Sequence, residues 1–251
     1  MTVFRTIRQI ALVSDFGYGG PYVGQVKLGL AACAPGLPVI ELISDLPAFQ
    51  PRLAAYLLPA LARDVPRGTL YVCVVDPGVG GDRDVLWVEA DGNCYLGPDN
   101  GLLAVVAKQA ADLALRRVDW RPSRLSHSFH GRDLFAPLAA KLAQGDTVAA
   151  MPLRRESMVG AEWPDERGAV IYVDHYGNLI TGLRGDRVER QRLVNAGGHQ
   201  LRYVRTFCEA APGTPFWYED AFGLVELAVN QGRADVKLNL GLGDEVVVAR
   251  S

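Results

Sequence analysis

Short apolar runs alternate with alanine- and leucine-rich stretches through the first half of the chain. Continuous runs of Val, Ile and Leu are typical of strands that are buried on both faces of a parallel sheet, and the stretches between them have the length of helices. This alternation predicts an N-terminal α/β layer domain with a mostly parallel sheet. The expected strands are 10–14, 39–43, 70–75 and 85–90, and the expected helices are 22–34, 51–62, 102–111 and 135–143.

The pattern changes in the second half of the chain. Residues 145–167 lose their periodicity and collect charge, proline and glycine, which is typical of a boundary between domains. Short alternating segments separated by Gly, Asn and Asp then follow, and they predict a smaller antiparallel β domain with a barrel-like form. We therefore expect an α/β domain over 1–150, a linker over 151–167 and a β domain over 168–251, with β segments at 169–183, 199–207, 224–230, 234–240 and 244–249.

Composition narrows the class of protein. The 251 residues are 49% hydrophobic and 22% charged, with a formal net charge of −2, so the chain can bury a full core. No dense run of Lys and Arg indicates nucleic acid or an anionic membrane, and no run of about 18 apolar residues or leader-like segment is found. We expect a cytoplasmic protein whose partner is a small molecule.

Asp76 lies where an apolar run meets a glycine-rich turn, in the stretch VVDPGVGGDR over 74–83. Ligands of open α/β sheets bind outside the carboxyl ends of the strands, so a carboxylate placed there can meet a substrate. The alternative is that Asp76 only stabilises the turn, as Asp often does. Asp15 follows the first expected strand in a similar turn, where it could accept hydrogen bonds from ribose hydroxyls.

The turn at Asp15 does not match a known nucleotide motif. It has no G-x-G-x-x-G pattern, so a nicotinamide or flavin dehydrogenase is disfavoured. Its Asp-Phe-Gly triplet precedes every other motif, whereas in kinases that triplet follows the catalytic loop.

His130 offers an imidazole in the segment SHSFHGRDLFAP over 126–137. A single His near a turn is more often structural, and Asp133 beside it could be a helix N-cap. Together, Asp76, Arg83 and His130 could hold and polarise a water molecule. The chain has no H-x-x-x-H, H-x-H, D-x-D or C-x-x-C spacing, so we expect neither a metal site nor a metal cofactor.

The segment YVDHYGNLITG over 172–182 predicts a hairpin with a Gly-Asn pair in its turn. A plain β-turn explains the pattern by itself. A functional interpretation adds that Asn178 could pair with an adenine edge while Tyr176 stacks on the base.

Six motifs in this order, DFG…PYVG, VVDPGVG…R, GPDNGLL, SFHGRDLFAP, DHYGNLITG and FGLVELAVNQG, resemble the S-adenosyl-L-methionine (SAM) hydroxide adenosyltransferase family over nearly the whole chain. The resemblance implies an α/β domain followed by a β domain, and homotrimers with active sites between neighbouring subunits. It also implies hydrolysis of SAM to adenosine and L-methionine, with SAM as the substrate and no cofactor. The implied catalytic residues are Asp76, Arg83 and His130.

The resemblance also bears on substrate binding. Asp174 matches the position that binds the methionine amine. An acidic residue that often precedes PYVG in the family is Gly20 here, and the Asn-Ser pair that commonly precedes the F-G-L-x-E segment is Asp220 and Ala221. The serine of that pair helps to bind the methionine carboxylate, so its replacement suggests a different arrangement at that end of the substrate.

Two other functions remain open at this point. Halide-using relatives, of the chlorinase and fluorinase type, lack the acid, guanidinium and imidazole set, and the fluorinases carry an extra loop where this chain has only a short connection between Arg83 and Gly97. A non-catalytic SAM or adenosine sensor would not need Asp76, Arg83 and His130 together. Hydrolysis is therefore favoured over both.

Overall fold

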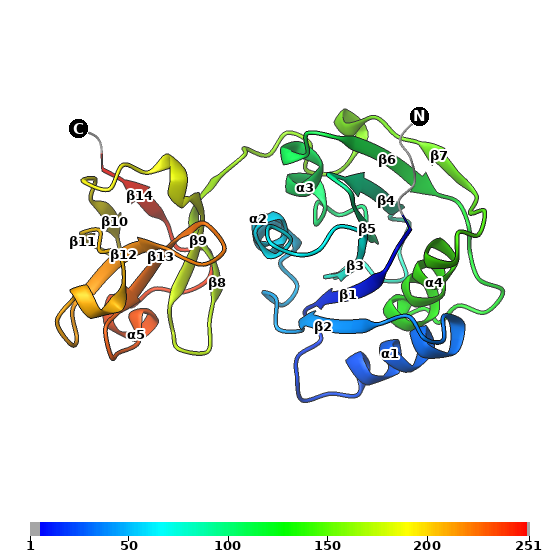
Figure 1. Cartoon of the computed structure of the whole chain (residues 1–251), viewed down its shortest axis with the longest axis horizontal. Coiled ribbons are helices and arrows are strands. Elements are labelled where there is room, and N and C mark those ends of the chain that lie inside the picture. The colour runs from blue at the N-terminus through cyan, green and yellow to red at the C-terminus, as the bar shows by residue number, and fades with distance from the viewer. Residues whose placement is uncertain (1–5, 250–251) are drawn as a thin grey trace. The chain divides into compact units, whose positions relative to one another are not determined.

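The computed structural model describes residues 6–249 (Figure 1). The described residues fall into two compact units, one made of the residues up to Ala55 with Asp64–Trp163, the other of Tyr56–Arg63 with the residues from Pro164 on. No helix among these residues has the length and apolar character needed to cross a membrane.

A seven-stranded sheet organises the first unit, with the strand order β2-β1-β3-β5-β4-β6-β7. The pairs β2-β1, β1-β3 and β3-β5 are parallel, and β5-β4, β4-β6 and β6-β7 are antiparallel. Five of the seven strands therefore run in one direction, which confirms the mostly parallel sheet. The strands are β1 (Gln9–Ser14), β2 (Val39–Ile43), β3 (Thr69–Val74), β4 (Val85–Ala90), β5 (Asn93–Pro98), β6 (Leu113–Val118) and β7 (Ala150–Pro152).

The helices of this half of the chain follow the predicted positions. They are α1 (Tyr22–Cys33), α2 (Pro51–Leu61), α3 (Ala104–Gln109) and α4 (Ala136–Gln144), with a short 3₁₀ turn η2 (Arg155–Ser157). A π-helical turn η1 (Gly131–Phe135) precedes α4, so the helix expected to begin at Phe135 is entered earlier and more irregularly. Asp133 lies inside that turn, and the suggestion that it is an N-cap is wrong.

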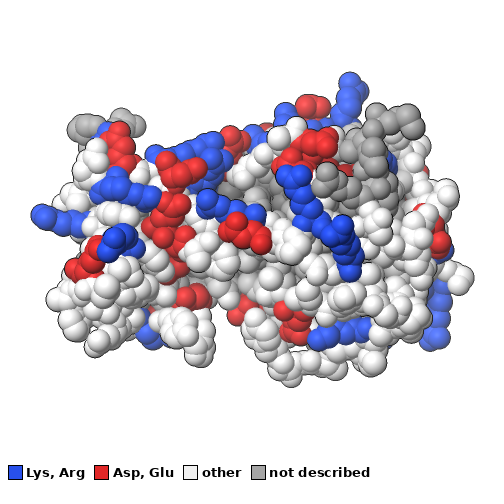
Figure 2. Space-filling model, viewed as in Figure 1, with Lys and Arg blue, Asp and Glu red and all other residues white. Residues whose placement is uncertain are grey.

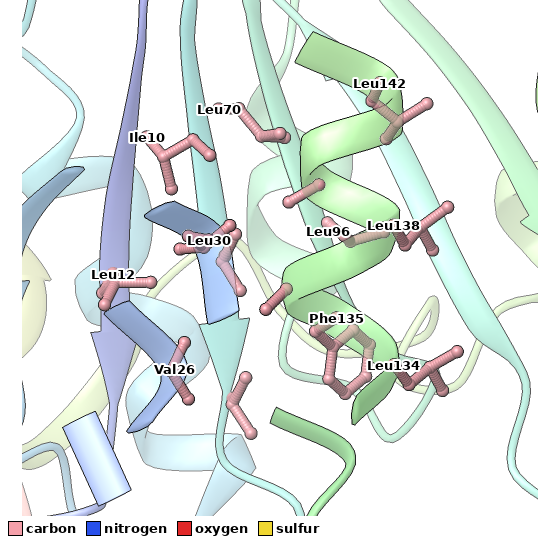
Figure 3. Packing of buried hydrophobic residues seen from close by; sticks show 14 of the residues in the cluster. Ile10, Leu12, Val26, Leu30, Leu70, Leu96, Leu134, Phe135, Leu138 and Leu142 are labelled. Carbon is pink, nitrogen blue, oxygen red and sulfur yellow. The ribbon is translucent and has the colours of Figure 1, made fainter. Parts of the chain in front are cut away.

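The core of the first unit lies between the sheet and the helices α1 and α4. All six residues of β3 are buried, and α1 buries Val23, Val26 and Leu30 along one stripe. Figure 3 shows side chains of both helices gathered against those of the central strands. Full burial of each large apolar side chain contributes about 1.5–3 kcal/mol, so this layer fixes the edge where β1 and β3 end.

The second unit contains two separate antiparallel sheets. The larger has the order β12-β13-β9-β8 and the smaller the order β11-β10-β14. Within residues 6–249 the strands form no closed barrel, so the barrel-like form expected from the sequence is not found. The elements are β8 (Arg167–Val173), β9 (Leu179–Arg184), η3 (Gly185–Arg187), β10 (Val194–Ala196), β11 (His199–Leu201), η4 (Phe207–Glu209), β12 (Pro215–Glu219), β13 (Leu224–Val229), α5 (Ala234–Leu238) and β14 (Val246–Val248).

Residues Ala234–Leu238 form a short helix, α5, where a β segment was expected over 234–240. Ala234 and Leu238 are buried four residues apart, while Val236 between them is 72% exposed. Burial with that spacing matches one face of a helix, since strand residues on one face are two apart. The alternation of polar and apolar residues misled the prediction because five residues are too few to separate the two periods.

Candidate active site

The sheet brings two carboxylates to one edge. Strands β1 and β3 are parallel neighbours with Ser14 opposite Val74; Asp15 directly follows β1, and Asp76 follows β3 after Val75. The amide of Asn100 donates to the carbonyl oxygen of Val75 at 2.8 Å, which holds the chain immediately before Asp76. The two acids therefore lie at the carboxyl end of the sheet, where α/β folds bind ligands.

Arg83 lies at the end of the loop that leaves β3, and its side chain returns to Asp76. Its Nε donates to both carboxylate oxygens at 2.9 Å, and its Nη2 donates to Oδ2. The Arg83 side chain is 11% exposed and the Asp76 side chain 4%. The guanidinium also lies over the ring of Phe135, 5.8 Å from its centroid. A buried ion pair is retained only when its hydrogen bonds are well satisfied, as they are here.

His130 completes this group from a distant part of the chain. It precedes η1, is 6% exposed, and places Nδ1 2.8 Å from Nη2 of Arg83. Burial lowers the pKa of His130 below its ordinary value, and the positive charge of Arg83 lowers it further. A guanidinium can only donate, so Nδ1 of His130 accepts and the neutral ring carries its proton on Nε2.

Two glycines allow the loops around this group to approach each other. Gly80, in the loop before Arg83, has φ +84°, and a Cβ there would collide with the carbonyl oxygen of His127. A Cβ on Gly131, directly after His130, would lie 2.9 Å from the ring of Phe16, the residue after Asp15. The Asp76, Arg83 and His130 segments are thus pressed together at positions that only glycine can occupy.

Asp15 is half-buried beside this group. Its Oδ2 accepts a hydrogen bond at 3.0 Å from the backbone N–H of Phe49, which has the left-handed φ of +61°. Burial raises the pKa of Asp15, and the nearby Asp76 carboxylate raises it further. Phe16, Tyr22 and Phe129 form a cluster of rings in the adjoining segments, with centroids 5.4 to 6.1 Å apart. Asp15 therefore has an aromatic neighbourhood suited to a nucleoside.

The hairpin turn between β8 and β9 carries the residues expected to contact substrate in the second unit. Asp174 accepts hydrogen bonds from the backbone N–H of Asn178 at 2.8 Å and from its side-chain amide at 2.9 Å. Gly177 has φ +82°, and Tyr176 at the tip is 73% exposed. The predicted hairpin is confirmed. Its turn bonds Asn178 to Asp174 and leaves the Tyr176 ring, which meets the His175 ring edge-on, largely exposed.

A cavity of about 630 Å³ lies in the second unit and is lined by this turn. Its wall also includes the aromatic rings of Phe207, Tyr218 and Phe222, and three carboxyl groups. Apolar walls with a few polar groups are typical of small-molecule sites. The carboxyl groups belong to Asp174, Asp220 and Glu226.

Glu226 is a site residue that the sequence analysis did not single out. It lies in the middle of β13, is 4% exposed, and accepts a hydrogen bond from the Tyr218 hydroxyl at 2.7 Å. Burial raises the pKa of Glu226 to about 7, and the charges of Asp220 and Asp174 contribute. The sequence signal for Glu226 is a single acidic residue inside the apolar run LVELAV, because burial of a charged group costs free energy unless the group is paired or hydrogen-bonded.

The structure therefore collects the candidate residues in two places. Asp15, Asp76, Arg83 and His130 lie at the sheet edge of the first unit, and Asp174, Tyr176 and Asn178 line the cavity of the second. Among residues 6–249, no three His, Cys, Asp or Glu side chains are grouped so that they could hold a metal ion.

Comparison with known proteins identifies the family that this arrangement matches. The models of the SAM hydroxide adenosyltransferase N-terminal and C-terminal domains match residues 10–152 and 168–247. A (R)-S-adenosyl-L-methionine hydrolase of Thermus thermophilus is 37% identical, covering 94% of this chain and 98% of that protein. A crystal structure of an uncharacterized conserved protein from Thermotoga maritima matches with a TM-score of 0.86 at 28% identity, over 96% of this chain and 100% of that one. A fluorinase of an Actinoplanes strain is more distant, at 24% identity over 96% of this chain and 97% of that protein.

Proposed function

The chain belongs to the SAM hydroxide adenosyltransferase family, and we propose that Asp76, Arg83 and His130 carry out its reaction. The reaction is the hydrolysis of SAM to adenosine and L-methionine. The observation that carries the assignment is the Arg83 guanidinium, bound on one side to the Asp76 carboxylate and on the other to Nδ1 of His130.

The chemistry sets what these residues have to do. The oxygen of water forms a bond to C5′ while the bond from C5′ to sulfur breaks, and the electron pair remains on the sulfur of methionine. The leaving group is a neutral thioether, so no acid is needed to expel it. The positive charge moves from sulfur to the attacking oxygen, which then has to lose a proton. Catalysis therefore depends on positioning the water in line and on accepting its proton.

The geometry suggests a separate task for each residue. Asp76 retains lone pairs beyond those used by Arg83, so it can accept the proton of the water. His130 presents its Nε2–H as a donor that fixes the oxygen of the water. Arg83 holds both partners in one orientation and balances the charge of Asp76 within a buried site.

The remaining residues are proposed to bind the substrate. Asp15 accepts hydrogen bonds from the ribose hydroxyls, Asn178 pairs with the adenine edge and Tyr176 stacks on the base. Asp174 receives the amine of the methionine part. We propose that the enzyme is a homotrimer in which the Asp76 group of one subunit and the Asp174 turn of a neighbouring subunit enclose one substrate.

Mixing two inactive variants tests the shared site. Asp76→Ala and Asn178→Ala are purified separately, combined in equal amounts and allowed to exchange subunits. If each site draws on two chains, random exchange restores about a quarter of the wild-type activity. If each chain contains its own complete site, the mixture stays inactive. The released adenosine and methionine are quantified by chromatography.

Water rather than halide is the proposed nucleophile. Asp76 is proposed to accept a proton from the attacking water, and a halide ion carries no proton for it to accept. Hydrolysis should therefore proceed at an unchanged rate in buffer rich in chloride or fluoride. Formation of 5′-halo-5′-deoxyadenosine would instead place this chain with the halide-using relatives.

The proposal includes no metal cofactor, nucleic acid or membrane partner, and places the reaction in the cytoplasm. Basic and acidic side chains are interspersed on the face that Figure 2 shows, consistent with a net charge of −2 and a small-molecule partner. Hydrolysis should persist after treatment with EDTA, and loss that a divalent ion restores would refute the metal-free part. We further propose that the chain prefers the (R) sulfonium form for which its Thermus relative is named, which an assay of the two separated epimers decides.

A further inference from the structure

The cavity of the second unit holds three carboxyl groups, and one of them is incompletely bonded. Asp220 is 8% exposed, and its Oδ1 accepts the backbone N–H groups of Phe222 and Leu224 at 2.8 Å each. Its Oδ2 is buried and has no hydrogen-bond partner. A buried carboxylate oxygen without a partner costs free energy, and a cation bound in the cavity that Asp220 lines would reduce that cost.

The side chains in the wall of this cavity are poorly suited to bind an anion. Arg233 is the basic side chain in its lining, and it is already paired, because Nε and Nη2 donate to Asp235 and Nη1 donates to the carbonyl oxygen of His175. Asp220 and Glu226 are buried near each other, and burial raises the pKa of both. A ligand carboxylate would meet repulsion here, whereas a cation would offset the cost of the buried acids.

The arrangement also argues against an inorganic cation. Metal ions need several oxygen ligands directed at one point, and among the described residues these acids do not form such a group. They line the wall of the cavity together with aromatic rings. An organic ammonium on a flexible arm can reach such dispersed acids, and a sulfonium can pack against the rings.

We propose that this cavity receives the amine-terminated arm of the sulfonium substrate, and that the enzyme therefore also hydrolyses sulfonium nucleosides whose arm carries an amine and no carboxylate. The inference rests on the proposed function of the chain. Asp220 is its specificity-determining residue, since it lines the same cavity as Asp174, which is proposed to receive the amine, and the α-carboxylate of SAM is attached to the same carbon as that amine.

The additional reaction balances as SAM hydrolysis does. The water oxygen bonds to C5′, the bond from C5′ to sulfur breaks, and the electron pair stays on sulfur. The proton leaves through Asp76. With SAM that lacks its α-carboxylate, the products are adenosine and 3-(methylthio)propylamine, and no further reactant is needed.

The test compares SAM with its decarboxylated form, both as the same sulfonium epimer, on the wild-type enzyme. The decarboxylated substrate should have a kcat/KM about tenfold higher, carried by a lower KM, since removal of one like charge at a short distance is worth that much or more. The Asp220→Asn variant keeps the oxygen that accepts from Phe222 and Leu224, and should remove this preference by changing the ratio of the two KM values. Asp186→Asn, at an exposed acid outside the cavity, is the matched control and should keep the preference.

Ligand binding separates failure of this inference from failure of the proposed function. Calorimetry with adenosine present should show tighter binding of 3-(methylthio)propylamine than of L-methionine, whether or not SAM is hydrolysed. Efficient SAM hydrolysis together with a decarboxylated substrate at least tenfold poorer, and methionine the tighter ligand, would overturn the inference and leave the proposed function standing. An Asp220→Asn variant that weakens both ligands equally would also overturn it, because Asp220 would then be a structural residue.

Discussion

Charged side chains are bonded differently at the sheet edge of the first unit and in the cavity of the second. At the edge, the Asp76 carboxylate is bonded to Arg83, and Arg83 is bonded to His130, so the group satisfies itself before any ligand arrives. In the cavity, Asp220 keeps an oxygen without a partner among the described residues, and Glu226 accepts from the Tyr218 hydroxyl. The first group is preorganised, and the second is completed by the substrate.

This difference separates two contributions to activity. A preorganised group acts mainly on the transition state, so its loss should lower kcat with little change in binding. A site whose acids await a cation contributes binding energy, so its loss should raise KM. The substitutions below test this division on the first unit, and Asp220→Asn tests it on the cavity.

Arg83→Ala should have the largest effect, because it removes the group that joins Asp76 to His130. We expect kcat to fall by about 10³-fold, within the range for losing acid-base and positioning groups together. Removing one partner of a buried pair also destabilises the fold by about 3–5 kcal/mol, so unfolding is measured beside the steady-state rate. Arg117→Ala is the control, because Arg117 is in an exposed pair with Asp119 and should change neither value. An unchanged kcat in the Arg83 variant would show that the ion pair is structural.

Gly80→Ala tests whether the close approach of the loops matters. The new Cβ would push against the carbonyl oxygen of His127 and displace Arg83 from His130, so kcat should fall by up to about 10²-fold, the scale for a displacement near 1 Å. Gly36→Ala is matched, because Gly36 also has positive φ, +85°, but has open space around it. It should lose only the 1–2 kcal/mol or so of left-handed strain, seen in thermal unfolding, and keep its kcat. Equal loss of activity in both variants would attribute the effect to strain alone.

Asp15→Ala should separate substrate binding from catalysis within the first unit. Asp15 lies beside the proposed catalytic group and accepts a hydrogen bond from the backbone N–H of Phe49, and it is proposed to bind ribose. KM should rise by about tenfold, the scale of one or two lost hydrogen bonds to a charged group, while kcat changes little. A fall in kcat with KM unchanged would move Asp15 into the catalytic group. Steady-state kinetics with SAM separates these outcomes.

The pH dependence of kcat should be small near neutrality. The pKa of His130 is lowered in the folded protein, so the ring stays neutral and keeps accepting from Arg83 until the pH falls below its ordinary value of about 6.5. We expect kcat to be flat from about pH 8 to 6.5 and to fall below that. The contribution of His130 to stability has the same sign, because the unfolded chain binds the proton more readily and is favoured as pH falls. Glu226 contributes with the opposite sign, because its pKa is raised to about 7 in the folded protein. His199→Gln, at an exposed histidine, should keep the profile, and a kcat that already declines above pH 7 would contradict the assignment.

Much of the first unit could be predicted from its sequence, because local pattern and tertiary structure agree there. Strands at 10–14, 39–43, 70–75 and 85–90 were recognised from their continuous apolar runs. β5 was missed because its Gly97 and Pro98 are typical of turns, yet it is held between β3 and β4 on both sides. Local residue preferences could not show that support, since both neighbours lie elsewhere in the sequence.

The sequence allowed us to predict which residues belong to the candidate site, but not how they are bonded to one another. Asp76, Arg83 and His130 each stand out beside a glycine-rich or strand-end segment. That Arg83 lies between the other two, with Nδ1 of His130 as acceptor, follows only from the folded path of the chain. Glu226 escaped notice because its neighbours in β13 are apolar, and its partner Tyr218 comes from the adjacent strand β12.

The most direct test of the central claim measures the chemical step itself in His130→Ala. Saturating SAM is mixed with excess enzyme, single-turnover formation of adenosine is followed, and the Kd for SAM is measured separately. We expect the single-turnover rate to fall by about 10²-fold or more, with the Kd within about threefold of wild type. An unchanged single-turnover rate, with lower activity explained entirely by weaker SAM binding, would make His130 a binding residue and contradict the assignment of the reacting centre.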